Sequence, residues 1–284
     1  MKPPPFSYAR PQTLPDVISC LASWGNDGKI LAGGQSLIPL LNLRLARPAV
    51  VIDIGGVDSL SGIGAEDETV VIRAATRQRH AERSARLRSL CPLVGQALSH
   101  VAHAQIRARG TVGGSLAHAD PASELPAVAV ALDAEFITQG PAGARTIPAP
   151  EFFLGPYTTA LADDEVLCEI RLPATTGHGT AFLELARRRG DYALAGVAAR
   201  VRLDDSGRVA SAALAACGVG GVPVRLRAAE QAVTGRRPDD AAVRDAAGEA
   251  SGEVSPSPDV HADAAYRRRL LGTLVARAIQ EAAR

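Results

Sequence analysis

This chain of 284 residues has few cysteines, no long apolar run and almost no excess of charge of either sign. Its four cysteines, Cys20, Cys91, Cys168 and Cys217, lie far apart, with no CxxC pair and no Cys/His cluster. That spacing argues against a zinc site or an iron–sulfur site within the chain. We therefore expect buried thiols in a reducing compartment, and so a cytoplasmic protein.

Several other classes of protein are disfavoured by what is missing. No apolar run approaches the roughly 20 residues of a membrane span, and the N-terminal MKPPPFSYARP lacks the apolar core of a secretory signal. A formal net charge of +1 gives no sign of nucleic-acid binding. Among the six histidines, His100 and His103 could share a helix face, but no third metal ligand accompanies them.

The remaining composition, 46% hydrophobic and 21% charged, is that of a globular protein. Residues 14–24 are predicted as a helix that Thr13 caps and Gly25 ends. Further helices are expected at 77–90, 91–101, 122–132, 225–234, 239–250 and 262–283. Strands are expected at 29–32, 50–54, 69–76, 134–138, 165–172, 181–189, 195–203 and 208–217.

This order of elements predicts an α+β fold in two parts. Residues 1–176 would form two α/β lobes with a cofactor between them. Turn formers at 173–179 mark the boundary. Residues 177–284 would form a smaller domain, with a three-stranded antiparallel sheet and a helical bundle.

Two segments share the order strand, Gly-Gly, small polar residue, apolar residue: LAGGQSL at 31–37 and GTVGGSL at 110–116. Glycine allows positive φ and close approach of a ligand, so consecutive N–H groups can form a nest for phosphate oxygens. The hydroxyls of Ser36, Thr111 and Ser115 could add donors. Each segment alone is equally a tight turn, and neither is a P-loop or a G-x-G-x-x-G fingerprint. Facing one another, they would clamp the pyrophosphate of an ADP-containing cofactor.

Nucleophile and metalloprotease motifs, G-x-S-x-G and H-E-x-x-H, are also absent. A chain without a catalytic dyad fits a protein in which a cofactor supplies the chemistry.

Five longer segments resemble the flavin-binding medium subunit of the molybdenum hydroxylases, which include the carbon monoxide dehydrogenase and xanthine dehydrogenase groups. They are AGGQSLIPLLNLRLARPAVVIDI (32–54), IRARGTVGGSLAHADPASELPAVAVALDA (106–134), FFLGPYTTALADDEVLCEIRLP (152–173), RRRGDYALAGVAARVRL (187–203) and YRRRLLGTLVARAI (266–279). The resemblance covers nearly the whole chain in order. It implies noncovalent FAD in a PCMH-type domain over residues 1–176, followed by a carbon monoxide dehydrogenase flavoprotein C-terminal domain over 177–284.

The resemblance also implies which residues bind FAD. The pyrophosphate would be wrapped by Ile30, Leu31, Ala32, Gly33, Gly34, Gln35, Ser36 and Leu37. A second cradle would comprise Thr111, Gly113, Gly114 and Ser115. Val101 would lie beside the cofactor, and Leu167 would give the isoalloxazine ring a backbone or apolar contact.

For three further positions the resemblance implies a contact with the cofactor, but an ordinary structural role remains an alternative. His118 stands where relatives often have Thr and would contact the phosphate or flavin region, or it is a surface histidine. Glu124 would accept hydrogen bonds from cofactor hydroxyls, or it is a solvated acid at a helix start. Asp120 would bind the cofactor or cap the following helix.

The loop at 187–192 resembles a mobile loop beside the flavin. Tyr192 would stack on the ring or be a core aromatic. Arg187 would stabilise an anionic reduced flavin or be solvated. Some relatives have Lys where this chain has Leu183, so no charged contact is expected there.

In the function that the resemblance implies, a large subunit with a molybdenum cofactor hydroxylates the substrate. Electrons cross [2Fe–2S] clusters of a small subunit to FAD on this chain and leave to NAD⁺, oxygen or a quinone. A dimer of heterotrimers, a heterohexamer, is expected. The alternatives are a stand-alone FAD-dependent oxidoreductase, often tethered through His or Cys where this chain has Gln35 and Ser36, and a non-redox nucleotide-binding scaffold.

Overall fold

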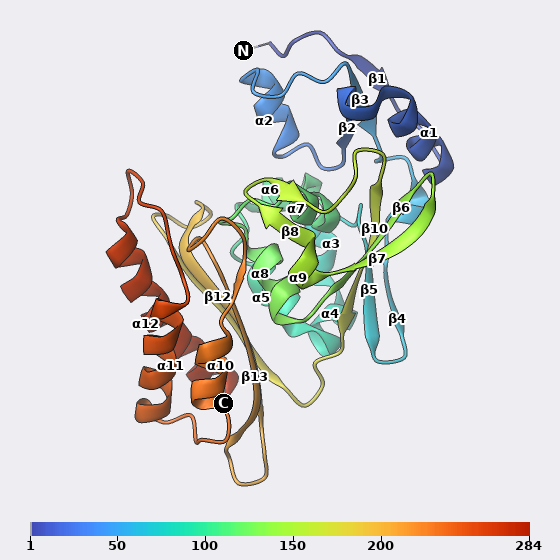
Figure 1. The fold of residues 1–284 in the computed structure, drawn as a ribbon. Coiled ribbons are helices and arrows are strands. Elements are labelled where there is room, and N and C mark those ends of the chain that lie inside the picture. Colours follow the sequence, from blue (N-terminus) through green and yellow to red (C-terminus); the bar gives the residue numbers. More distant parts are fainter. Residues whose placement is uncertain (1) are drawn as a thin grey trace.

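The computed structural model describes residues 2–284, and for Asp240 the backbone alone. Figure 1 shows three parts in chain order: an N-terminal lobe, a middle lobe and a C-terminal domain. The mixture of parallel and antiparallel sheets with helices confirms the predicted α+β class.

The N-terminal lobe is a parallel sheet in the order β1–β3–β2, with β1 at Ser7–Ala9, β2 at Gly28–Leu31 and β3 at Val50–Asp53. Helix α1, Leu14–Trp24, forms as predicted, because Thr13 accepts the N–H of Asp16 and Gly25 ends the helix at φ +50°. Helix α2, Leu37–Asn42, follows β2. Short 3₁₀ turns lie at Gly25–Asp27 and Asp58–Leu60.

The middle lobe has an antiparallel sheet in the order β4–β5–β10–β6–β7. Its strands are Ile63–Glu66, Thr69–Arg73, Val166–Pro173, Glu135–Gly140 and Gly143–Pro148 in that order. The helices are α3 Gln78–Arg83, α4 Ala85–Leu90, α5 Pro92–Leu98, α6 Ala104–Arg109, α7 Val112–His118, α8 Glu124–Ala131 and α9 Ala149–Phe152. A small hairpin pairs β8, Phe153–Gly155, with β9, Thr158–Thr159.

The single helix predicted for 77–90 is two helices. Ser84 is extended, with ψ at 119°, and its hydroxyl accepts the N–H of Leu87. A serine that caps a new helix interrupts the previous one, which is why the basic amphipathic pattern continues while the backbone does not.

The C-terminal domain has four antiparallel strands in the order β11–β12–β13–β14, not three. They span Gly179–Ala186, Ala193–Leu203, Val209–Cys217 and Val224–Arg225. Helices α10 Arg227–Val233, α11 Asp240–Gly252 and α12 Ala264–Ala282 complete the domain. Strand β14 was missed because two residues carry no alternating pattern.

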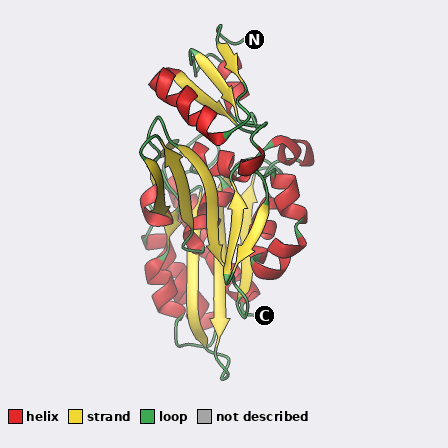
Figure 2. Ribbon diagram, turned by 90° about the vertical axis from the view of Figure 1, so that its right-hand side faces the viewer, coloured by secondary structure: helices red, strands yellow, loops and turns green. Residues whose placement is uncertain are grey.

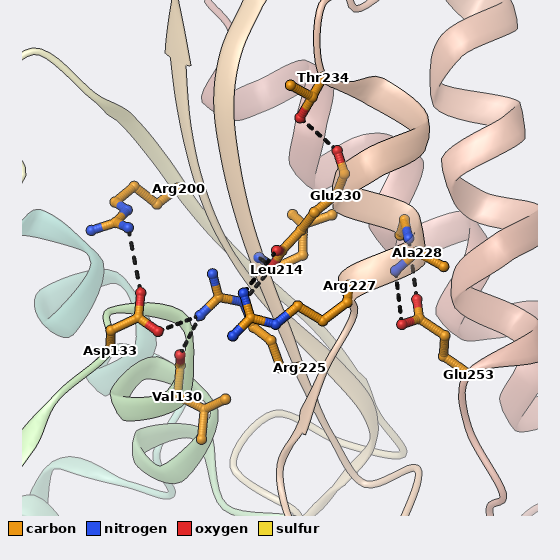
Figure 3. A network of polar contacts seen from close by, with 11 residues as sticks. Val130, Asp133, Arg200, Leu214, Arg225, Arg227, Ala228, Glu230, Thr234 and Glu253 are labelled. Carbon is orange, nitrogen blue, oxygen red and sulfur yellow. Dashed lines mark hydrogen bonds and ion pairs between the residues drawn. The ribbon is translucent and has the colours of Figure 1, made fainter. Parts of the chain in front are cut away.

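Side-chain contacts with the middle lobe hold β14 in place. Arg225 donates to the carbonyl oxygen of Val130 at 2.9 Å and to Asp133 at 2.8 Å, and it also pairs with Glu230 (Figure 3). Glu230 in turn accepts the N–H of Leu214 at 2.7 Å. One arginine thus joins the second and third parts of the molecule.

The sheet of the C-terminal domain is buried on both faces. Val197 and Ala199 belong to the core formed with α10–α12, whereas Phe182 and Ala198 belong to the core of the middle lobe. Successive strand residues face opposite sides, so one alternating apolar pattern serves two cores. Figures 1 and 2 show this sheet between the C-terminal helices and helices of the middle lobe.

Candidate functional site

The loop between β2 and α2 carries the first glycine pair. Gly34 has a φ of +74°, and the backbone N–H groups of residues 33–36 have no hydrogen-bond partner among residues 2–284. Their carbonyls are engaged in part: Gly33 accepts from the Gln35 side chain at 3.1 Å, and Gly34 accepts from the N–H of Ile38 at 3.1 Å. Four successive unpartnered amides are the donor set of an anion-binding nest.

The second glycine pair is not a turn. It lies in the first turn of α7, where the side chain of Thr111 caps the N–H of Gly114 at 3.0 Å. The N–H of Val112 donates to Thr76 at 2.9 Å and that of Gly113 to Ala74 at 2.8 Å. The expected second nest of free amides is therefore wrong, since the chain already uses those donors.

Nevertheless the two glycine pairs face each other. A Cβ built on Gly33 would lie 2.6 Å from the Arg109 carbonyl oxygen and 2.7 Å from Gly110 Cα. A Cβ on Gly114 would lie 3.5 Å from that of Ala32. The bare backbones thus let the N-terminal lobe approach the start of α7, with the free amides at the junction.

The C-terminal end of α7 brings together His118, Asp120 and Tyr157, a tyrosine of the LGPYTT segment for which no role was expected. The His118 and Tyr157 rings are 5.1 Å apart, and the Tyr157 hydroxyl donates to Asp120 at 3.4 Å. Burial lowers the pKa of His118, which favours the neutral imidazole. Tyr157 follows Pro156 in LGPYTT and has a φ of +56°, rare for a non-glycine residue, so its placement is imposed.

The predicted cap of α8 by Asp120 takes another form. Its carboxylate accepts the N–H of Ala122 at 2.9 Å, inside the loop, while Ser123 occupies the N-cap position. Ser123 makes no capping bond and instead lies 3.1 Å, oxygen to oxygen, from Ser115. Asp120 therefore shapes the loop that leads from α7 to α8.

Glu124 begins α8 and is not a solvated acid, since only 7% of its surface is exposed. No side chain within residues 2–284 forms a hydrogen bond or ion pair with its carboxyl group. Burial, and then the neighbouring Glu184, raise the pKa of Glu124 to about 8. Near neutral pH the group is protonated, so it can donate as well as accept, in contrast to the acceptor-only carboxylate expected.

The loop between β11 and β12 contains Tyr192 and Arg187, and their surroundings bear on the alternatives expected for each. Tyr192 is 71% exposed and so is not a core aromatic. Partial burial, and then the nearby carboxyls of Asp120 and Glu124, raise the pKa of its hydroxyl. Arg187 donates to His261 at 2.9 Å. Leu183 packs against the C-terminal core, which agrees with the absence of a charge there.

Two further predicted residues lie in or against the core of the middle lobe. Leu167 is 5% exposed, next to an irregularity in β10, and its side chain is part of that core. Val101 packs on the same core, and its carbonyl accepts from Arg107 at 2.7 Å. Contact of either residue with a cofactor stays a prediction.

These features fit a pyrophosphate. The anion would meet four amide donors, and a Cβ at Gly33 would clash with the backbone beside it. Among residues 2–284, no three His, Cys, Asp or Glu side chains are placed to hold a metal ion. In that same range, no helix combines the length and apolarity that crossing a membrane requires. Fold and site together indicate a protein that binds a phosphate-containing ligand, for which the main-chain donors of residues 33–36 are available.

Comparison with known proteins narrows this class. Residues 4–175 match the FAD binding domain in molybdopterin dehydrogenase, and residues 180–282 match the CO dehydrogenase flavoprotein C-terminal domain. The 6-hydroxypseudooxynicotine dehydrogenase complex subunit alpha of Paenarthrobacter nicotinovorans is 39% identical over 99% of this chain and 96% of the relative. The carbon monoxide dehydrogenase medium chain of Hydrogenophaga pseudoflava is 38% identical, with 99% and 98% covered.

Solved structures agree. Carbon monoxide dehydrogenase from Hydrogenophaga pseudoflava superposes with a TM-score of 0.97 at 40% identity, covering 99% of this chain and 98% of that one. Quinoline 2-oxidoreductase from Pseudomonas putida 86 gives 0.96 at 35% identity, covering 100% and 98%. The chain belongs to the family of FAD-binding medium subunits of the molybdenum hydroxylases, which are oxidoreductases.

Proposed function

We propose that this chain transfers electrons as the FAD subunit of a multisubunit molybdenum hydroxylase. It takes electrons from the [2Fe–2S] clusters of a small subunit and passes them to an external acceptor, while a large subunit with the molybdenum cofactor oxidises the substrate. The run of four unpartnered amides at 33–36 carries the proposal, because these amides can bind the pyrophosphate of FAD. FAD is the cofactor that would link the [2Fe–2S] donor to the external acceptor. Relatives named as a medium chain and as a complex subunit support partners of this kind.

The pyrophosphate of FAD would be held by the amides of 33–36 and by the hydroxyl of Ser36, which makes no capping bond in α2. Thr111 would hold the start of α7 in place through its bond to Gly114 rather than offer amides of its own. Bound FAD supplies the exchange between electrons that arrive singly and electrons that leave in pairs.

Other residues would shape the place of the flavin ring. Tyr192, exposed on its loop, is free to lie against a ring face. His118, favoured in its neutral form by burial, can offer one donor and one acceptor beside Tyr157. Glu124, which is buried and has no side-chain partner among the described residues 2–284, would form its hydrogen bonds with the cofactor's hydroxyls.

The proposed arrangement has FAD in residues 1–176 and the carbon monoxide dehydrogenase-type domain in 177–284, a division supported by the matches at 4–175 and 180–282. We further propose a dimer of heterotrimers in the cytoplasm. The organic substrate would be bound on the large subunit, outside this chain.

Purification of the full chain, alone and with its two partners, tests the proposal. The chain alone should be yellow, release FAD in acid and rebind it. Its flavin should be reduced by dithionite but not by the substrate of the complex. In the complex, that substrate should reduce the flavin. A colourless chain that refuses FAD would indicate the scaffold, and turnover by the chain alone would indicate a stand-alone oxidoreductase.

A further inference from the structure

Helix α2 and the turn that follows it are apolar yet largely uncovered. The segment LIPLLNLRL, residues 37–45, has a single buried residue, Leu41. Ile38 is 39% exposed, Leu43 56% and Leu45 74%. Within residues 2–284 no residue of this segment belongs to any of the three hydrophobic cores, and Figure 1 shows α2 standing apart from the sheets.

The backbone holds these side chains outward. Helix α2 ends in a Schellman motif, in which the N–H of Leu45 donates to Leu40 at 2.9 Å and that of Arg44 to Leu41 at 3.0 Å. Arg44 has a φ of +60° where glycine is usual. The residue after it normally packs back onto the helix, but Leu45 is the most exposed of the three apolar side chains. The hydrogen bonds of this turn therefore hold Leu45 in a position exposed to solvent.

The charged residues in the chain segment that contains the patch have one sign. From Gly28 to Ile52 the chain contains no Asp or Glu, whereas it contains Lys29, Arg44 and Arg47. Both arginines are exposed at the patch. Apolar side chains with arginines beside them are typical of a protein–protein interface, and a complementary surface would have an apolar centre and an acidic rim.

The position of the patch indicates which partner fits. Helix α2 begins at Leu37, directly after the amides of 33–36, so anything docked on it lies beside the cofactor loop. We propose that Ile38, Leu43 and Leu45, flanked by Arg44 and Arg47, form the docking surface for the [2Fe–2S] subunit. This inference rests on the proposed function, in which that subunit is the electron donor.

Site-directed labelling in the assembled complex tests it. In a Cys20→Ser background, whose other cysteines are buried, the Leu45→Cys variant should react with a maleimide in the free chain. In the complex its rate should fall about tenfold or more, in line with burial of an apolar side chain. The matched control is Val260→Cys, at a residue 92% exposed, which should react equally in both forms.

A photo-crosslinker attached to the Leu45→Cys variant then identifies the subunit that covers the patch in the complex. Links to the [2Fe–2S] subunit support the proposal, whereas links to the large subunit or to a second copy overturn it. Unchanged labelling in a complex that forms normally would overturn this inference and leave the proposed function standing. Failure of the wild-type chain to form any complex would overturn both.

The double variant Leu43→Gln/Leu45→Gln gives an independent measurement. It should weaken binding of the [2Fe–2S] subunit by about tenfold or more, while FAD content and the melting temperature stay unchanged, because both side chains are exposed. Arg47→Glu should weaken binding further and reduce its salt dependence. Equal binding by these variants and by Val260→Gln would contradict the proposal.

Discussion

The two glycine pairs have nearly the same local sequence and opposite roles. At Gly33–Gly34 the amides have no partner among residues 2–284, whereas the N–H of Gly113 donates to the carbonyl of Ala74 and that of Gly114 to the capping side chain of Thr111. The first pair presents donors, and the second removes side chains so that α7 can touch β5 and the N-terminal lobe. A glycine signature therefore predicts close approach, but only the hydrogen-bond partners show whether a ligand or the protein itself comes close.

The largest effect should follow from filling the packing pair. A Cβ on Gly113 would lie 2.4 Å from Ala74 Cβ and 2.7 Å from its carbonyl oxygen, so Gly113→Ala must move α7 away from the backbone that directly follows β5. We expect a loss of about 3 kcal/mol or more in the free energy of unfolding, measured by urea denaturation.

Gly95→Ala is the matched control, because Gly95 also lies in a short helix and has open space around it. That change should be neutral or stabilise by up to about 1 kcal/mol. Equal stability of the two variants would contradict a packing role for Gly113.

Filling the donor pair should damage binding more than folding. Gly33→Ala introduces a Cβ 2.6 Å from the Arg109 carbonyl oxygen and so displaces the loop whose amides would hold pyrophosphate. We expect FAD affinity, measured by fluorescence titration, to fall by a factor of about 100, which corresponds to the loss of about two hydrogen bonds to a charged group. Gly64→Ala, where a Cβ meets nothing within 4 Å, should bind normally. Retained affinity in Gly33→Ala would contradict the role of this loop.

Glu124 lies at the start of α8, the helix that packs on β12 and β13, and its pKa of about 8 in the folded chain exceeds its ordinary value of 4.5. The folded chain then holds a proton that the unfolded chain has lost, so this contribution is complete below about pH 4.5 and disappears as the pH rises through about 8. The free energy of unfolding of the FAD-free chain should fall by on the order of a few kcal/mol as the pH rises from about 4.5 to about 8.

The measurement is the melting temperature of the FAD-free chain between about pH 6 and about pH 9. Glu124→Gln should flatten the profile, while Glu151→Gln, at an exposed acid, should reproduce the wild-type slope. The neighbours Glu184, Asp120 and Arg107 also act on Glu124 and are unchanged in both variants. A wild-type slope in Glu124→Gln would show that another group causes it.

How much of this was predictable differs between the two glycine pairs. Helix α1 and the long strands β12 and β13 follow from caps and alternation within their own residues. The glycine pattern predicts either a nest of free amides or a tight turn in both segments, and in the first one the donors at 33–36 have no partner among residues 2–284. The second segment instead begins α7. The use of its amides could not be predicted locally, because their acceptors Thr76 and Ala74 lie more than 30 residues away in sequence.

The same distance in sequence explains what was missed at the site. The contact of Tyr157 with His118 and Asp120 joins segments that local pattern cannot relate, although the tyrosine stood inside a quoted motif. The raised pKa of Glu124 arises from burial under β11–β13, which no window around the residue reports. Local sequence preferences predicted most helices and strands. The chemistry of the site depends on contacts between residues that are distant in sequence.

The smallest effect should separate the hydroxyls next to the two pairs. Thr111→Val removes the side-chain acceptor of the Gly114 N–H and should cost about 1 kcal/mol of stability. Ser36 caps nothing, so Ser36→Ala should leave the melting temperature unchanged and weaken FAD binding by about tenfold, one hydrogen bond to a charged group. Calorimetric melting measures the stability of both variants, and FAD titration measures their affinity for the cofactor. If Ser36→Ala destabilised the chain and Thr111→Val only weakened FAD binding, the roles of the two segments would have to be exchanged.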